Sequence, residues 1–430
     1  MELTHLSAQN FRTFEDLDID LEGMEVLIGA NASGKSNFLN LIEFISDLAD
    51  YGLEDAVYLQ GGITEVRNRS ITDGKNFKLN FKVEDIDIDG ITTLPAPINK
   101  EESLIFFEMD TLSYSFELDL KGQDYEVINE KAEFTYELVH AEEEGDPKLL
   151  DTETKIIITR ENNTLDYDIE YPDLDMPKKD IKEEMVPTPV LKELEGAQLD
   201  DKELVLESQY GLLFNSLISE LGDISVYDIE PGKVKTGTQV SGKKELEKNG
   251  ENLSVVLDDI GKDDEKRSRF NELSEDLVPF IDRFEVEKNE DRSFVLKLVE
   301  NFFGENEREK SHSIASMISD GTINIYSLIV ALFFENKPII GIEEPGRNIH
   351  PALITKLVRL MEEASLDKQV IATTHDPDIL KSVKNENVLL VQRNDSGFTE
   401  VKRPMEDEVV STFLKNEIGI EELHRDNIMG

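Results

Sequence analysis

The chain has 430 residues and no cysteine, and its 93 acidic residues outnumber its 45 basic residues, which gives a formal net charge of −48 at pH 7. The absence of cysteine excludes disulfide bridges and zinc–thiolate sites and favours a reducing compartment. The sequence has neither a signal-like start nor an apolar run long enough to cross a bilayer, so we expect a cytoplasmic protein without a membrane partner.

The acidity argues against a broad basic face of the kind that clamps duplex DNA. Two explanations of the charge stay open. An acidic surface suits a salty cytoplasm, where salt screens its self-repulsion, and it also suits docking to a basic partner. The acidic residues are spread along the chain and form no single tail, which favours adaptation to salt.

The first predicted elements are two strands within residues 3–22, where apolar and polar residues alternate loosely around Asn10-Phe11-Arg12. Arg12 is a candidate for contact with a nucleotide or with a second subunit, because these strands lead directly into the next motif. A surface arginine on an edge strand is an equally good interpretation.

A predicted phosphate-binding loop follows the apolar strand at 24–28. The segment Gly29-Ala-Asn-Ala-Ser-Gly34-Lys35-Ser36 fits the pattern G-x-x-x-x-G-K-S, whose glycines let backbone N–H groups curl around phosphate oxygens. Lys35 would reach the β- and γ-phosphates, and the Ser36 hydroxyl would hold Mg²⁺. Apolar residues at helical spacing over 38–45 place a helix N-terminus behind the loop. The candidate nucleotide-binding residues of this segment are Asn31, Ala32, Ser33, Gly34, Lys35, Ser36 and Asn37.

The stretch from 70 to 172 is predicted to be rich in strands, and it follows a turn at Leu59-Gln60-Gly61-Gly62. Gln60 is a candidate for contact with Mg²⁺ or with an attacking water, since a glutamine in a loop between lobes suits that task. A turn residue without a catalytic role is the alternative. The predicted strands are Phe77 to Val83, Leu104 to Met109, Tyr114 to Leu120, Ala132 to Val139 and Lys155 to Thr159.

Prolines and charges between 171 and 189 predict a linker with little regular structure. Beyond it, apolar residues recur at helical spacing over 191–221 and 253–260. The polar loop between these stretches, 231–250, contains the one local basic cluster. A solvated loop is favoured there over a contact with nucleic acid or a partner. The lysines of the cluster are Lys233, Lys235, Lys243, Lys244 and Lys248.

Three further motifs follow residue 314. The first, Ser319-Asp320-Gly321-Thr322, opens a helix that is apolar nearly all round, which predicts a buried helix capped by Ser319 or Thr322.

The second motif is an apolar strand over 338–342 that ends in Glu343 and Glu344, and the third is a strand over 369–374 that ends at His375. Carboxylates at the carboxyl end of a strand face the ligand site of an open α/β sheet. Glu343 can hold Mg²⁺ directly or through water, and Glu344 can polarise the water that attacks a γ-phosphate. His375 occupies a position where a γ-phosphate contact is expected. A last sheet strand is predicted at 387–393.

In their order, these motifs resemble those of the ABC-type ATPases of the OLD and RecF branch. Residues 1–62 look like the opening of that family, and residues 314–393 look like its signature, Walker B, D-loop and switch-histidine run. The resemblance implies an α/β fold, an ABC-type P-loop ATPase head with a large inserted β-rich and helical region. We expect the first part of the head at 1–70, a β-rich insert at 71–172, a linker and helical insert at 173–310, and the second part of the head at 311–430.

The resemblance also implies a homodimer, or a higher oligomer, that is joined head to head around ATP and Mg²⁺. Each ATP would be bound by the phosphate loop of one protomer and capped by Ser319 and Gly321 of the other. Residues 346–350 would be the D-loop between the two sites. The further implied roles are Glu344 as the catalytic carboxylate, Glu343 and Ser36 as Mg²⁺ ligands, and His375 as the γ-phosphate sensor.

Relatives of the OLD type often carry a nuclease domain, and the tail after Arg393 is too short for one. We therefore expect a separate effector protein, for which a nuclease is one candidate, and a role in anti-phage defence. A DNA-repair or DNA-binding ATPase of the RecF/SMC-like type is an alternative, and a scaffold in which ATP is structural is another.

Overall fold

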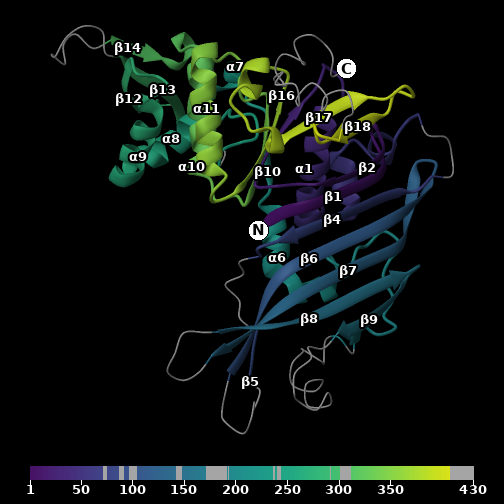
Figure 1. The fold of residues 1–430 in the computed structure, drawn as a ribbon. Helices are drawn as coiled ribbons and strands as arrows, with labels where there is room; N and C mark the ends of the chain where they lie inside the picture. The colour runs from purple at the N-terminus through teal and green to yellow at the C-terminus, as the bar shows by residue number, and fades with distance from the viewer. Residues whose placement is uncertain are drawn as a thin grey trace. The chain divides into compact units, whose positions relative to one another are not determined.

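The computed structural model describes residues 1–70, 75–86, 92–95, 104–141, 148–170, 191, 193–235, 238–239, 244–290, 292–300 and 311–406. The chain forms two compact units, and many of their elements are labelled in Figure 1. Unit 1 comprises Met1–Glu22, Asn40–Asp223 and Asn394–Glu400. Unit 2 comprises Gly23–Leu39, Ile224–Arg393 and Val401–Gly430. The linker predicted at 171–189 lies outside the described residues.

Unit 1 contains an antiparallel sheet whose strands run in the order β2-β1-β4-β6-β7-β8-β9, with β5 paired to β6. The long strands β6, β7 and β8 lie side by side in Figure 1. The strands are β1 (Glu2–Phe11), β2 (Phe14–Asp20), β4 (Phe77–Glu84), β5 (Thr92–Pro95), β6 (Leu104–Lys121), β7 (Asp124–Ala141), β8 (Lys148–Glu161) and β9 (Thr164–Glu170).

The strands predicted within residues 3–22 are confirmed as β1 and β2. The prediction of two separate strands at 104–109 and 114–120 is wrong, because both belong to β6. The register of β6 against β7 shifts between Met109 and Thr111, where a bulge absorbs the break in the apolar alternation.

Helix α1 (Lys35–Tyr51) packs on this sheet through an aromatic side chain. The ring of Phe44 in α1 lies 6.2 Å from that of Phe11 in β1 and 6.0 Å from that of Phe77 in β4, measured between centroids. All three side chains are fully buried, so the predicted helix after the phosphate loop has its apolar face in a core. The helices of unit 1 are α1 (Lys35–Tyr51, from Asn40 onward), α2 (Leu53–Leu59), α3 (Ile63–Val66), the 3-10 helix η1 (Gln209–Phe214) and α6 (Asn215–Gly222).

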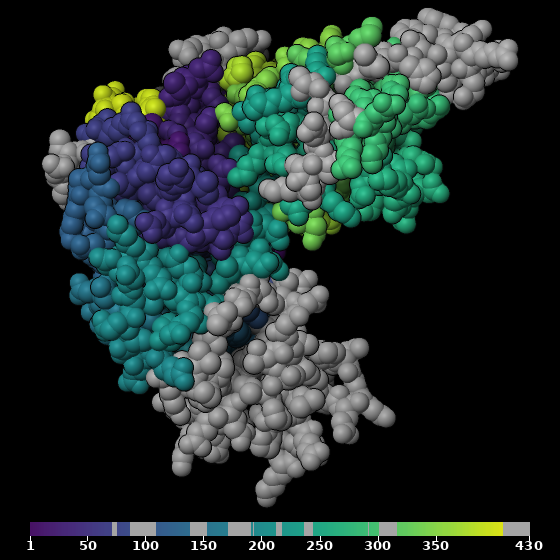
Figure 2. Space-filling model, turned by 180° about the vertical axis from the view of Figure 1, so that it is seen from behind, coloured from purple at the N-terminus to yellow at the C-terminus, as the bar shows by residue number. Residues whose placement is uncertain are grey.

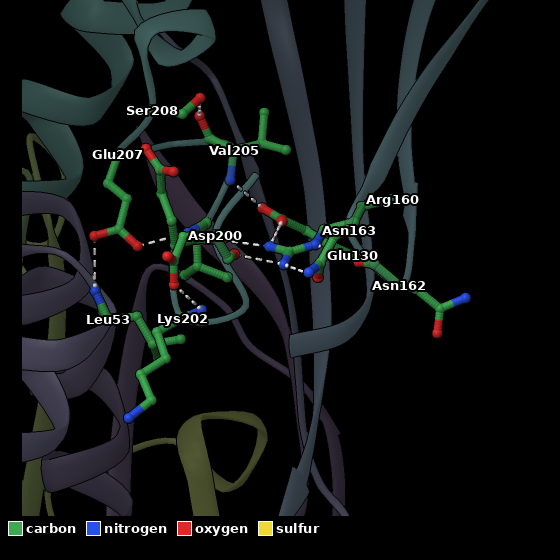
Figure 3. A network of polar contacts seen from close by, with 12 residues as sticks. Leu53, Glu130, Arg160, Asn162, Asn163, Asp200, Lys202, Val205, Glu207 and Ser208 are labelled. Carbon is green, nitrogen blue, oxygen red and sulfur yellow. Dashed lines mark hydrogen bonds and ion pairs between the residues drawn. The ribbon is translucent and has the colours of Figure 1, made fainter. Parts of the chain in front are cut away.

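The segment from 193 to 222 contacts the sheet of unit 1 through the bridge of Gln198 to Thr164 and the hydrogen bond of Arg160 to Asp200. In Figure 2, teal atoms of this part of the chain lie beside the blue atoms of the sheet. The buried side chain of Arg160 in β8 connects the sheet to this segment. Its guanidinium is 1% exposed and donates hydrogen bonds to the carbonyl oxygens of Asp200, at 2.7 Å, and of Glu203. Figure 3 shows the side chain of Arg160 beside Asp200, Asn163 and Glu130.

Glu130 of β7 completes this buried network (Figure 3). One carboxylate oxygen accepts hydrogen bonds from the backbone N–H of Val205, at 2.8 Å, and from the Tyr114 hydroxyl. The other carboxylate oxygen lies 3.8 Å from Nη1 of Arg160. Burial raises the pKa of Glu130 to about 7, although these hydrogen bonds and the positive charge of Arg160 act to lower it.

Unit 2 contains a second sheet, in which the strands run in the order β10-β15-β16-β3-β17-β18. The pairings of β10 with β15, β15 with β16, β16 with β3 and β3 with β17 are parallel. The central strands β3 and β16 are buried along their whole length, which is typical of parallel strands, and their buried residues include the polar Glu25 and Gln369. The strands are β3 (Met24–Ile28), β10 (Ser225–Tyr227), β15 (Ile339–Glu343), β16 (Gln369–Thr374), β17 (Val388–Arg393) and β18 (Thr399–Lys402).

Two helices share a core with one face of this sheet, α10 (Asp320–Phe333) and α11 (Pro351–Ala364). Almost every residue of α10 is buried, as its apolar sequence predicted. The strands at 338–342, 369–374 and 387–393 are confirmed as β15, β16 and β17. The shorter helices of unit 2 are α7 (Pro231–Val234), η3 (Ala315–Met317), α12 (Pro377–Leu380) and η4 (Asn385–Asn387).

A smaller antiparallel sheet in unit 2, of order β11-β13-β12 with β14 on β13, was not predicted. Its strand signal is the alternation of the buried Phe294, Leu296 and Leu298 with the half-buried Ser293, Val295 and Lys297. Phe284 of this sheet packs edge-on against Phe270 of α9, with centroids 5.0 Å apart. The elements are α8 (Leu253–Lys262), α9 (Asp264–Glu275), β11 (Thr238–Gln239), β12 (Ile281–Lys288), β13 (Ser293–Glu300) and β14 (Ser311–Ile314).

Among the described residues, no helix combines the length and the apolar character needed to span a membrane.

Candidate functional site

The predicted phosphate loop connects β3 to α1 in unit 2, with the strand ending at Ile28 and the helix beginning at Lys35. Ala32 and Gly34 have positive φ angles of 65° and 120°. A Cβ added to Gly29 would lie 2.0 Å from the carbonyl oxygen of Val391 in β17, so only glycine fits at this position. The strand, loop and helix context expected for a G-x-x-x-x-G-K-S motif is therefore present.

Lys35 lies folded over the loop. Its Nζ donates to the carbonyl oxygens of Gly29, at 2.8 Å, and Ala30, at 3.1 Å. Burial lowers the pKa of Lys35, and the nearby carboxylates of Glu344 and Glu343 act in the opposite direction. The lysine thus presents a cation inside the loop, where phosphate oxygens would accept its hydrogen bonds in place of the two carbonyls.

Parallel pairing brings three strand ends together beside this loop. In the register of the sheet, Glu343 of β15 pairs with Thr373 of β16, and Thr374 pairs with Ile28 of β3. As a result, the Ser36 hydroxyl in the first turn of α1 donates to Oε1 of Glu343 at 2.5 Å. The sheet therefore joins a hydroxyl and a carboxylate that are 307 positions apart in the sequence.

Ser36 and Glu343 offer two hard oxygen donors side by side. Mg²⁺ in phosphate-binding sites is commonly held by one or two protein oxygens together with phosphates and water, so this pair fits that ion. Within the part of the chain that the structure describes, no group of three or more His, Asp and Glu side chains could hold a metal on its own. Two protein oxygens leave coordination positions of Mg²⁺ for phosphate oxygens and water.

Glu344 and His375 form a second pair at the same edge of the sheet. Nδ1 of His375 lies 2.7 Å from Oε1 of Glu344, and the backbone N–H of His375 donates to the other carboxylate oxygen at 3.3 Å. Glu344 has a φ of 50°, a strained conformation for a residue with a side chain, and its N–H donates to the carbonyl of Thr373 at 3.0 Å. The histidine thereby fixes a carboxylate that could accept a proton from water.

The start of α10 packs against the segment 346–350. Ser319 caps the helix, since its hydroxyl accepts the N–H of Thr322 at 3.1 Å, as predicted. A Cβ on Gly321 would lie 2.3 Å from the carbonyl oxygen of Asn348, so glycine permits a close backbone contact here. The side chain of Asn324 donates to the carbonyl of Arg347 at 2.5 Å. The predicted signature and D-loop segments are thus one packed assembly.

Arg12 and Gln60, the two candidates from outside these motifs, lie in unit 1 and contact each other. Nη2 of Arg12 donates to the Gln60 side-chain oxygen at 2.5 Å, and the Gln60 amide donates to Asp47 at 3.2 Å. Burial lowers the pKa of Arg12. The other candidates all lie in unit 2, so roles for Arg12 and Gln60 at the phosphate loop stay predictions.

Arg393, at the end of β17, was missed by sequence reasoning. Its Nε and Nη2 both donate to the carbonyl oxygen of Ala32, at 3.1 Å each. No motif marks this arginine, because the contact joins positions 361 residues apart.

In the basic cluster predicted at 231–250, Lys233 pairs with Glu230 at 2.7 Å and Lys235 pairs with Asp320 at 2.5 Å, while Lys243 lies outside the described residues. Contacts with acidic side chains of the same chain suit the interpretation as a solvated loop, and contact with a partner stays open.

Comparison with known proteins gives a family match over most of the chain. The family model described as "AAA domain, putative AbiEii toxin, Type IV TA system" matches residues 26–170 and 189–381. Over 47 residues, the chain is 45% identical to the DNA replication and repair protein RecF of Lactobacillus acidophilus, a match that covers 11% of this chain and 12% of that protein. RecF of Roseiflexus castenholzii is 47% identical over 47 residues, with the same coverage of each chain. The chain thus matches only a small part of the length of these relatives.

Among solved structures, the SmcHead bound to the C-winged helix domain of ScpA is similar in fold, with a TM-score of 0.51 and 15% identity. The alignment covers 94% of this chain and 98% of that chain. This likeness concerns the fold, and it confirms the predicted α/β architecture of an ABC-type ATPase head.

Proposed function

The chain belongs to this family of AAA-domain proteins, and from that premise we propose that it is a slow, Mg²⁺-dependent ATPase of the ABC type. The observation that supports this most is the convergence of Lys35, Ser36, Glu343, Glu344 and His375 at one edge of the sheet of unit 2. Positioning and charge stabilisation carry most of the catalysis of phosphoryl transfer, and these residues supply both.

The phosphate loop binds the triphosphate through backbone N–H groups and the start of α1. Lys35 turns from the loop carbonyls to the β- and γ-phosphates. Ser36 and Glu343 would hold Mg²⁺, and the chemistry that this ion would supply is neutralisation of negative charge on the phosphate oxygens. The loop itself contains Asn31, Ala32, Ser33 and Gly34, and Asn37 follows in the first turn of α1.

Glu344 takes the proton of the attacking water, because its carboxylate is fixed at 2.7 Å by His375 beside the phosphate loop. His375 holds this carboxylate and senses the γ-phosphate. A water oriented by a carboxylate attacks in line with the leaving oxygen, so both residues act on the hydrolysis step more than on binding.

We further propose that the active form is a homodimer closed head to head, in which Ser319 and Gly321 of one protomer cap the nucleotide of the other. The packed contact between the start of α10 and 346–350 supports this, since it ties the capping segment to the loop that follows Glu344. ATP binding would then close the dimer and hydrolysis would open it.

In the cell, we propose a cytoplasmic role in which this cycle gates or holds a separate effector protein, for which a nuclease is one candidate, in anti-phage defence. Membership of the OLD branch is part of the same proposal. The second candidate function is DNA repair or DNA binding of the RecF/SMC type, which the local identity to RecF favours and the net charge of −48 opposes.

The substitution Glu344→Gln tests the catalytic assignment. The amide keeps the shape of the carboxylate and cannot accept the proton, so we expect ATP turnover to fall by about 10²-fold or more while ATP binding is retained. Turnover is measured by phosphate release, and binding by equilibrium dialysis with Mg-ATP.

Glu290→Gln, at an exposed turn of the same unit, is the matched control and should leave both values unchanged. Turnover of Glu344→Gln within a factor of two of the wild type would remove Glu344 from the mechanism. A wild type that neither binds nor hydrolyses ATP would overturn the proposed function.

A further inference from the structure

Strand β17 holds the phosphate loop at two points. The first is the close approach of the Val391 carbonyl to Gly29, which leaves no room for a side chain on the loop. The second lies two residues further along the strand, where Arg393 donates from Nε and Nη2 to the carbonyl oxygen of Ala32, at 3.1 Å each. Both contacts are made within unit 2.

The contact from Arg393 falls on the strained part of the loop. Ala32 has a φ of 65°, in the left-handed region that alanine disfavours, and it is solvent-exposed, so apolar packing does little to hold it. A planar guanidinium offers N–H donors in a rigid fork, which suits a carbonyl that must keep one direction. The direction of the Ala32 carbonyl sets the peptide plane that leads into Ser33, Gly34 and the first turn of α1.

We propose that Arg393 is a positioning residue for a nucleoside triphosphate. By fixing the Ala32 carbonyl, it keeps the N–H groups of the following residues aimed at the phosphates before the ligand arrives. The inference rests on the proposed function, and it adds a residue that is not among the candidate site residues of the sequence analysis.

The effect of an Arg393 substitution on KM and kcat depends on the states of the reaction in which the loop binds the phosphates. Backbone N–H groups of a phosphate loop hold phosphate oxygens in the ground state and in the transition state alike. Loosening such a contact removes uniform binding, which raises KM for Mg-ATP and leaves kcat nearly unchanged.

The test compares Arg393→Ala and Arg393→Lys with Arg359→Ala, a control that removes the same charge from an exposed position of α11 in the same unit. For Arg393→Ala we expect KM for Mg-ATP to rise about tenfold, the loss expected for a charged hydrogen-bonding group, with kcat within a factor of two. Lysine keeps the charge and loses the fork, so Arg393→Lys should fall between Arg393→Ala and the wild type.

A second measurement needs no nucleotide. Hydrogen exchange of the amides of residues 30–34 should be faster in Arg393→Ala than in the wild type and in Arg359→Ala, because the loop is no longer held. Unchanged exchange would overturn the proposal, and so would an unchanged KM. A fall in kcat as large as the fall in kcat/KM would also overturn it.

The two measurements separate this inference from the proposed function. If the wild-type protein binds no Mg-ATP, the proposed function fails, and with it the assignment of a triphosphate as the ligand. The holding of the loop by Arg393 is then decided by the exchange data alone.

Discussion

Glu130 illustrates how burial sets the chemistry of a single side chain. Its carboxyl is enclosed in unit 1 beside Arg160, Tyr114 and the N–H of Val205, and burial raises its pKa from 4.5 to about 7. Between these two values the folded chain keeps a proton that the unfolded chain releases. The contribution of Glu130 to the free energy of unfolding therefore falls as the pH rises through this window and is constant above it.

Replacing Glu130 by Gln removes this titration and keeps an oxygen that can accept the hydrogen bond of Val205. The free energy of unfolding of Glu130→Gln, relative to the wild type, should therefore increase between pH 4.5 and 7 by up to about 3 kcal/mol. Urea unfolding at a series of pH values measures this difference. The exposed Glu161→Gln serves as the control and should show no such trend. A difference independent of pH would contradict the buried, protonated carboxyl.

For individual residues, the position of a side chain could be predicted from the sequence only where a local motif determines its contacts. Lys35, Ser36 and the pair Glu343 and Glu344 were predictable, because strand, loop and helix geometry dictates where such residues lie. Arg393 was not, because its contact with Ala32 depends on the order of strands in the sheet. The bidentate pair between Arg403 and the fully buried Glu25, at 2.6 and 2.7 Å, escaped prediction for the same reason.

At the scale of elements, the start of α10 and the segment 344–350 behave as one piece. Arg347 is held by a hydrogen bond from Asn324 to its carbonyl oxygen and by an ion pair to Asp228, at 2.5 and 2.9 Å. The backbone of Gly321 touches that of Asn348. A change at the helix start must therefore move the loop that follows Glu344.

Gly321→Ala should separate these two elements. The new methyl group would lie 2.3 Å from the Asn348 carbonyl, so either the helix or the loop must shift. We expect the free energy of unfolding to fall by about 1–3 kcal/mol, the usual cost of overpacking, and ATP-dependent association to be lost while ATP binding is kept.

Gly232→Ala is the matched control for this change, because a Cβ there meets nothing within 4 Å in the described part of the chain. Urea unfolding and light scattering with Mg-ATP measure the two effects. Association of Gly321→Ala equal to that of the control would show that the contact has no part in it.

Helices and strands were predicted correctly where the hydrophobic pattern of a segment fits only one type of secondary structure. The apolar segments 26–28, 339–342 and 370–372 within β3, β15 and β16 suit buried parallel strands, and the apolar surface of α10 suits a buried helix. The hairpin of β12 and β13 was missed, because charged residues such as Arg283 and Glu285 interrupt a half-buried strand and hide its period. In β6 the bulge between Met109 and Thr111 interrupts the alternation of apolar residues, so two strands were predicted where the structure has one.

At the scale of the whole molecule, the fold and family agree with the predicted ABC-type head, while the boundaries at 70, 172 and 310 stay predictions. Such boundaries could not be predicted from the sequence, because strands that are neighbours in the sequence belong to different sheets. Strand β1 pairs with both β2 and β4 in unit 1, whereas β3, which follows β2 in the sequence, pairs with β16 and β17 in unit 2. Only long-range pairing decides this division.

The net charge of −48 affects any association of two copies. Like charges on two protomers repel at low ionic strength, and salt screens that repulsion over about 10 Å at 0.1 M. If nucleotide joins the protomers, association should depend on Mg-ATP at every salt concentration and should strengthen as salt is added.

The central claim is that two copies close around ATP bound by the loop from Gly29 to Ser36. The most direct measurement is the mass of Glu344→Gln in solution by light scattering, with and without Mg-ATP, at low and high salt. We predict the mass of one chain without nucleotide and twice that mass with Mg-ATP, because a protein that binds but cannot hydrolyse ATP should stay closed. A mass that is the same with and without Mg-ATP would contradict the account.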